Sequence, residues 1–209
     1  MDNYLIDIIQ RMLETSDQIM IAGFDSSITI SWKALREVEK IKTEDFIPQL
    51  ILFIDNEKNK KKRDKAYFLL GHIAKNISNT TALNYLIQRV DKEVDKYMIA
   101  SLIDRIADLN KPMKTDLQPL IQATKSDKWL IRHSAIQSLD NSLDPDAETA
   151  LTEILDNSDD PYNLTYANTT LYKIGTIKAI PHLEKHLKSR KRDVKNTAKC
   201  AIDEIIKRS

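Results

Sequence analysis

The sequence is poor in the residues that build tight turns. Among 209 residues there are only 3 glycines and 6 prolines. Because β-hairpins depend on glycine-rich turns, this scarcity argues against a β-rich fold. Three scattered glycines also exclude a glycine-rich phosphate loop.

The sequence also has a single cysteine, almost no net charge and no long apolar run. Cys200 is the one cysteine, so no internal disulfide forms, and we expect a packed, inert thiol in a reducing compartment. Charges at Asp2, Asp7, Arg11 and Glu14 break the N-terminal apolar run that a signal peptide needs. No eighteen apolar residues run together, and the net charge is +1. We therefore predict a cytoplasmic location, no membrane contact and no polyanion binding by the chain as a whole.

What the sequence does contain is an internal repeat. Each copy has three residues spaced four apart: a β-branched, basic or polar residue, then a small residue, then an aliphatic residue. In one copy Met98 takes the place of the small residue. The six copies are Ile30/Ala34/Val38, Lys62/Ala66/Leu70, Val94/Met98/Leu102, Ile131/Ala135/Leu139, Asn163/Ala167/Leu171 and Val194/Ala198/Ile202. A period of 31 to 37 residues indicates a solenoid of stacked helix pairs.

A second set of segments has apolar residues on one helical face and lies between these copies. Their apolar residues are Ile47, Leu50, Ile51 and Ile54; Leu83, Leu86, Ile87 and Val90; Leu117, Leu120 and Ile121; Ala147, Ala150, Leu151 and Ile154; and Ile180, Leu183 and Leu187. Asp144-Pro145 and Asp160-Pro161 place an N-cap residue before a proline at the first helical position. The chain is therefore predicted to alternate first and second helices.

Several of these segments resemble HEAT repeats. Residues 131–139, 194–202 and 66–73 resemble the first helix of such a repeat, and residues 179–183 and 46–50 resemble the second. The resemblance covers about residues 28–207. It implies that first helices lie outside and second helices line a concave face, and that the role is binding more often than catalysis.

The fold class predicted is all-α, a right-handed α-solenoid of about six HEAT-like helix pairs in a single domain, 1–209. A capping region at 1–26, with a helix near 2–14 that buries Leu5, Ile8, Ile9 and Met12, covers the first repeat, because an open stack needs its ends covered. The repeats are expected near 27–57, 58–91, 92–125, 126–157 and 158–189, with a half repeat at 190–209.

No group of residues forms a convincing catalytic or metal site. His182 and His186 share a helix face, but no Glu or Cys accompanies them in a known ligand pattern, so we expect a solvated pair rather than a metal site. The acidic run Asp156–Asp160 lacks the ligand spacing of a calcium loop and is expected to cap the next helix. We expect no catalytic residues, no metal and no cofactor.

Basic residues gather in two turns between a second helix and the next first helix. This predicted basic edge comprises Lys60, Lys61, Lys62, Arg63, Arg190, Lys191 and Arg192. It would contact phosphates if it bound nucleic acid. The acidic turn 156–160 lies between the two basic turns and would repel a continuous nucleic-acid backbone, so we favour a solvated edge.

The concave face is predicted to be polar, with no net charge and with apolar residues at its N-terminal end. Its candidate binding residues are Leu52, Phe53, Tyr85, Gln88, Arg89 and Gln122. Exposed aromatic and Arg residues often anchor protein interfaces. An alternative is that the N-terminal helix covers Leu52 and Phe53 and buries them.

These features favour a non-catalytic adaptor, inhibitor or scaffold that binds another protein through its concave face. One alternative is a HEAT-like protein that binds DNA along the basic edge. Another is an alkylpurine DNA glycosylase, since some of these enzymes are HEAT-like solenoids of about this length. Such an enzyme would need a basic concave face with an exposed Trp, whereas Trp32 and Trp129 fall on first helices.

Overall fold

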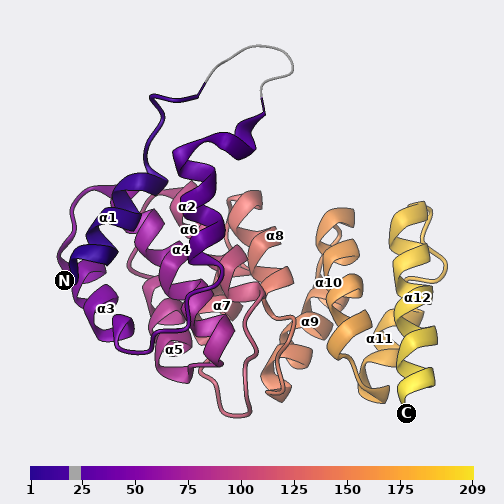
Figure 1. Ribbon diagram of the computed structural model, residues 1–209. Helices are drawn as coiled ribbons and strands as arrows, with labels where there is room; N and C mark the ends of the chain where they lie inside the picture. Colours follow the sequence, from indigo (N-terminus) through magenta and orange to yellow (C-terminus); the bar gives the residue numbers. More distant parts are fainter. Residues whose placement is uncertain (19–24) are drawn as a thin grey trace. The chain divides into compact units, whose positions relative to one another are not determined.

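A computed structural model describes residues 1–18 and 25–209 (Figure 1). Within these residues the secondary structure is helical, apart from one isolated bridge between Lys111 and Ser142. The prediction of an all-α protein is confirmed. The chain forms two compact units, Met1–Leu86 and Ile87–Ser209, which are described separately.

The first unit is built around α4. Its helices are α1 (Asn3–Met12), α2 (Ile30–Val38), α3 (Phe46–Asn56), α4 (Lys60–Ile77) and the first part of α5 (Thr80–Arg89). Helices α1, α2 and α3 all pack against α4. Helix α1 also packs against α2.

Helix α1 buries the four residues that the sequence predicted: Leu5, Ile8, Ile9 and Met12. Side-chain contacts with α2 and α3 fix its position. Arg11 Nη1 donates to Glu37 Oε2 of α2 at 2.8 Å, and the ring of Tyr4 stacks on that of Phe46 with centroids 5.8 Å apart. The expected capping region, 1–26, includes residues 19–24, which lie outside the described residues.

The second unit has two layers of helices (Figure 1). The first layer, here the A layer, consists of α6 (Lys96–Ala107), α8 (Trp129–Ser138), α10 (Pro161–Ile174) and α12 (Arg192–Arg208). The second, the B layer, consists of α7 (Gln118–Ala123), α9 (Pro145–Asn157) and α11 (Ile180–Glu184). Each A helix packs on the next, and each B helix packs on an A helix.

Small residues let the A helices approach one another closely. Ala135, Ala167 and Ala198 are fully buried, as the repeat predicted. Polar groups add specific contacts between successive repeats. The buried Asn168 of α10 donates from Nδ2 to the carbonyl oxygen of Val194 at 3.1 Å, and Arg132 Nε of α8 donates to Asn163 Oδ1 of α10 at 3.0 Å. Asn163 therefore replaces a β-branched core residue with a hydrogen bond between helices.

The repeat in α6 is shifted by one turn from its prediction. Val94 lies before the helix with 87% of its surface exposed, so its assignment to the helix is wrong. The carboxylate of Asp95 accepts hydrogen bonds from the backbone nitrogens of Tyr97 and Met98, which starts the helix after Val94. Met98, Leu102 and Ile106 are the buried triple, because the apolar spacing fits either of two registers one turn apart.

A buried lysine joins two connections of the second unit. Lys111, between α6 and α7, is fully buried, and its Nζ donates to the carbonyl oxygens of Leu109 and Asp140, both at 2.8 Å. Its backbone nitrogen donates to Asn141 O at 2.8 Å, and its carbonyl accepts from Leu143 N at 2.9 Å. Burial lowers the pKa of Lys111 to about 7, against the opposing effect of Asp140 and Asp108.

Two other expectations concern the ends of helices and the thiol. Asp144 and Asp160 cap α9 and α10 with their side chains, as predicted. Cys200 is exposed, so the expectation of a packed thiol is wrong. The buried stripe of α12 passes through Ala198 and Ala201, and Cys200 projects from another side of the helix.

Among the described helices, none has the length and apolar character needed to cross a membrane.

Candidate protein-binding groove

The predicted binding residues of the first unit lie on α3 and α5. Leu52 is 66% exposed, whereas Phe53 and Tyr85 are half-buried. Tyr85 Oη donates to Asp55 Oδ1 at 2.8 Å and thereby links α5 to α3. Close by, the backbone nitrogen of Asp2 donates to Gln49 Oε1 at 2.7 Å, so the start of the chain contacts α3 without burying Leu52.

The other three predicted residues belong to the second unit. Gln88 and Gln122 are exposed, and Arg89 is half-buried, with Nη2 3.4 Å from Glu93 Oε1. Since Glu93 is buried, this ion pair holds the guanidinium against its own turn. The six residues are thus divided between two units, and the idea that they form one surface stays a prediction.

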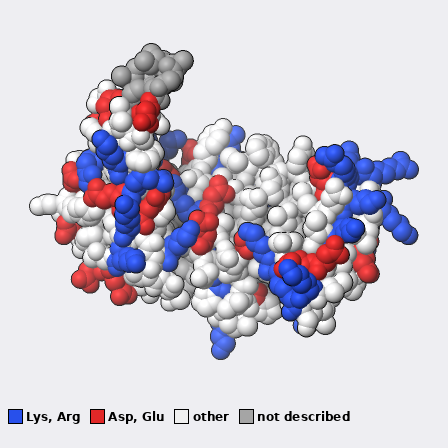
Figure 2. All heavy atoms as spheres, turned by 45° about the vertical axis from the view of Figure 1, so that its right-hand side comes forward, with Lys and Arg blue, Asp and Glu red and all other residues white. Residues whose placement is uncertain are grey.

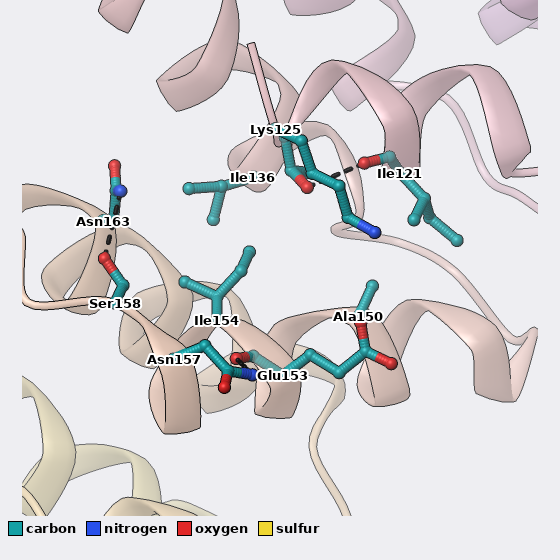
Figure 3. A pocket seen from close by; sticks show the side chains of 10 residues that line it. Ile121, Lys125, Ile136, Ala150, Glu153, Ile154, Asn157, Ser158 and Asn163 are labelled. Carbon is teal, nitrogen blue, oxygen red and sulfur yellow. Dashed lines mark hydrogen bonds between the residues drawn. The ribbon is translucent and has the colours of Figure 1, made fainter. Parts of the chain in front are cut away.

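The second unit contains a groove between the B helices α7 and α9, with a volume of about 310 Å³ (Figure 3). Its apolar lining consists of Ile121 from α7, Ile136 from α8, and Ala150 and Ile154 from α9. Asn163 of α10 closes one end, where its Nδ2 donates to Ser158 Oγ at 3.2 Å. The volume lies at the lower end of the range found for ligand pockets.

Charged side chains of opposite sign flank this groove. Lys125 extends from the end of α7 and Glu153 from α9, and both point into the gap between the helices (Figure 3). Both residues are exposed. Within residues 1–18 and 25–209, neither side chain forms an ion pair or a side-chain hydrogen bond. The groove therefore offers an apolar floor with an uncompensated cation on one wall and an uncompensated anion on the other.

Sequence reasoning placed these residues elsewhere. Ile121 and Ile154 fit the apolar stripes of their helices and were assigned to the core, yet both are half-buried. The stripe identifies which face of a helix is apolar, but it does not show where two neighbouring B helices separate. The exposed Gln122, next to Ile121, was the one predicted binding residue adjacent to the groove.

The predicted basic edge is divided between the two units. Lys60, Lys61, Lys62 and Arg63 form the first turn of α4, where Asn59 Oδ1 accepts from two of the backbone nitrogens. Arg63 Nη1 donates to the carbonyl oxygens of Glu57 and Lys58 at 3.0 and 3.1 Å. This guanidinium thus stabilises its own turn.

The second basic group lies at the start of α12. Arg190, Lys191 and Arg192 are all exposed. Figure 2 shows Lys and Arg side chains gathered at this end of the second unit. Because the two groups belong to different units, a continuous basic edge stays a prediction.

His182 of α11 and His186, in the turn that follows α11, contact the end of α9. His182 Nδ1 lies 2.9 Å from Asp156 Oδ2, and His186 Nε2 lies 2.9 Å from the carbonyl oxygen of Leu155. Lys185 Nζ donates to Asp156 Oδ1 at 2.7 Å. Lys185 and His182 together hold the pKa of Asp156 below its usual value. In the described part of the chain, no group of three or more His, Cys, Asp or Glu residues is arranged to hold a metal ion.

Aromatic rings of α8 and α10 form a cluster around His133. His133 lies between Trp129 and Tyr166, with ring centroids 5.7 and 4.8 Å away, and the ring of Tyr162 is 6.0 Å from it. Burial lowers the pKa of His133, with a smaller contribution from Arg132. Trp129 and Tyr162 remain 64% and 67% exposed. The cluster lies in the A layer, as the sequence indicated for Trp129.

The helix pairs and their layers define a repeat protein of the α-solenoid class, and comparisons with known proteins agree. Residues 117–202 match the family model described as HEAT repeats. A designed armadillo repeat protein in complex with the peptide (KR)4 superposes with a TM-score of 0.56 and 16% identity, covering 96% of this chain and 99% of that one. A second designed armadillo repeat protein gives 0.52, with the same identity and coverage. No curated protein matches.

The match to the HEAT repeat model extends from the start of α7 into α12, within the second unit. The resemblance to HEAT repeats proposed from the sequence is confirmed over these residues. The similarity to the designed proteins, at 16% identity, supports the repeat-solenoid fold alone.

Proposed function

We propose that this protein is a non-catalytic adaptor, inhibitor or scaffold, and that it binds a segment of another protein in the groove between α7 and α9. The observation that carries the proposal is the groove itself, an open pocket of about 310 Å³ between α7 and α9, with an aliphatic floor and polar side chains around it. Ligand sites are usually concave, with apolar side chains and a few polar groups that fix the orientation of the ligand. The HEAT resemblance assigns second helices to the concave, partner-binding side.

The designed armadillo repeat protein was solved with a bound peptide, which supports a peptide segment as the ligand of a similar fold. Such a segment would bury an aliphatic side chain against Ile121, Ile136 and Ile154. Removal of that side chain from water would contribute about 1.5–3 kcal/mol. The remaining affinity would come from contacts along the neighbouring B helices, which include the exposed Gln122. We place this protein in the cytoplasm as part of the same proposal.

The experiment begins with partner capture on the immobilised full chain from nuclease-treated and untreated lysate. The affinity of the purified partner is then measured for the wild type, for Ile154→Asp in the groove and for Thr169→Asp on the exposed side of α10. We expect at least a tenfold loss with Ile154→Asp and less than a twofold change with Thr169→Asp, while circular dichroism shows all three folded. Equal affinity for the three proteins would contradict the proposal.

A second candidate is nucleic-acid binding at the start of α12, favoured by the exposed cluster of Arg190, Lys191 and Arg192. Our expectation is non-specific binding of duplex DNA, with a Kd no tighter than about 10⁻⁴ to 10⁻⁶ M near physiological salt and a steep dependence on salt. Lesion-dependent binding at nanomolar Kd would instead favour the DNA glycosylase alternative. Release of alkylated bases from a damaged duplex tests that enzyme directly.

A further inference from the structure

The charges that flank the groove carry information about its ligand. Lys125, in the turn just after α7, and Glu153 of α9 lie on opposite walls and point into the same gap (Figure 3). Neither has an ionic partner among the residues that the structure describes, although ion pairs are common elsewhere in the second unit. A ligand in the groove therefore meets one positive and one negative group on either side of the apolar floor.

This arrangement disfavours any ligand whose charge has a single sign. A phosphate backbone would be attracted to Lys125 but repelled by Glu153. A polybasic peptide would be attracted to Glu153 but repelled by Lys125. A ligand with one acidic and one basic group, separated by an apolar group, satisfies both walls. Complementary charges of this kind mainly determine specificity, because like charges brought together are costly.

The geometry points to a partner segment in an extended conformation, with an aliphatic residue in the groove, an acidic residue facing Lys125 and a basic residue facing Glu153. Side chains of an extended strand alternate between its two faces. The three residues must therefore share one face and lie two positions apart, in the pattern acidic–x–aliphatic–x–basic or its reverse. This inference rests on the proposed function and adds the chemistry of the ligand.

Fluorescein-labelled peptides of equal length provide the probe, and the full chain provides the receptor. Four contain the cores Asp-Ser-Leu-Ser-Lys, Lys-Ser-Leu-Ser-Asp, Lys-Ser-Leu-Ser-Lys and Asp-Ser-Leu-Ser-Asp. A fifth replaces Leu by Ser in the tighter-binding mixed peptide. Fluorescence anisotropy gives the affinities. We expect one mixed-charge peptide to bind at least 4-fold more tightly than either single-sign peptide, since an exposed ion pair contributes about 2- to 5-fold. Loss of the leucine should weaken binding at least tenfold.

Charge reversal gives the sharper test. Lys125→Glu should shift the preference to the all-basic peptide, and Glu153→Lys should shift it to the all-acidic peptide. Both side chains are exposed, so both variants should unfold as the wild type does. A merely structural role for either residue would not reverse a preference. Lys178→Glu, on an exposed turn away from the groove, is the matched control and should leave the order of affinities unchanged.

The outcomes distinguish the charge pattern inferred for the ligand from the proposed role of the groove as a binding site. Leucine-dependent binding that ignores the charge pattern, or charge variants that keep the wild-type order, would overturn this inference and leave the groove as a binding site. Equal binding of the leucine and serine peptides, or no binding of any peptide, would overturn both. A reversed preference in both charge variants would support both.

Discussion

Lys111 provides a prediction whose sign and size follow from its surroundings. Its ammonium is fully buried and donates to two carbonyl oxygens. Burial lowers its pKa from 10.5 to about 7 in the folded protein. The unfolded chain keeps the ordinary value, so between pH 7 and 10.5 it binds more protons than the folded protein does. Stability from this residue therefore rises with pH across that interval.

The size of the effect follows from the two pKa values. They differ by 10.5 minus 7, or about 3.5, which at about 1.4 kcal/mol per pKa unit corresponds to about 5 kcal/mol over the whole interval. Between pH 6 and pH 9 the expected rise is about 2–3 kcal/mol. Below pH 7 both states hold the proton, so the cost of burying the charge is fully present and no longer varies with pH.

Urea unfolding at pH 6 and pH 9, followed by circular dichroism, measures this rise. Lys111→Met should lose the pH-dependent part while leaving two carbonyl groups without their donor, which costs about 1–3 kcal/mol for each unsatisfied group. Lys178→Met, at an exposed lysine, is the matched control and should follow the wild type. If Lys111→Met and the wild type gave parallel pH profiles, Lys111 would not titrate in this range and the reasoning would be refuted.

Four further predictions concern stability, two in the second unit and two in the first. Ala135→Leu should overpack the contact between A helices and reduce the free energy of unfolding by about 1–3 kcal/mol in urea titrations, whereas Gln137→Leu on the exposed side of α8 should change it little. Asp160→Ala should cost about 0.5–2 kcal/mol by the same assay, because α10 loses its N-cap. Glu37→Gln should reduce the free energy of unfolding by about 1 kcal/mol or less, since the ion pair of Glu37 with Arg11 is partly exposed. The hydrogen bond from Arg11 lowers the pKa of Glu37, so the difference in stability between wild type and variant should shrink as pH falls below 5. Leu52→Asp should leave the urea midpoint nearly unchanged, and a loss of about 3 kcal/mol would show that this exposed side chain is buried in solution.

The repeat made the helical architecture readable from the sequence. Ala135, Ala167 and Ala198 recur at nearly constant spacing, and their burial follows from the close approach of stacked helices. The N-caps at Asp144 and Asp160 were also predictable, because an acidic residue before Pro at the first helical position has few other uses. Local chemistry and periodicity agreed at these positions.

Other features depend on contacts that no short pattern encodes. The register of α6 was ambiguous by one turn, and the capping carboxylate of Asp95 decides it. Lys111 is buried because two connections meet around it, with Lys111 and Asp140 29 residues apart in the sequence, which its neighbours in sequence do not indicate. The groove arises where α7 and α9 separate, and its residues look like ordinary core positions until both helices are in place.

Photo-crosslinking in the native cell tests the central claim most directly. A benzophenone amino acid replaces Gln122, which is exposed beside the groove, or Thr169, which is exposed on α10. We predict a discrete protein adduct from position 122 that is absent from position 169 and is lost when Ile154→Asp is added. Equal adducts from both positions, or a position 122 adduct that persists with Ile154→Asp, would contradict a partner-binding role for this groove.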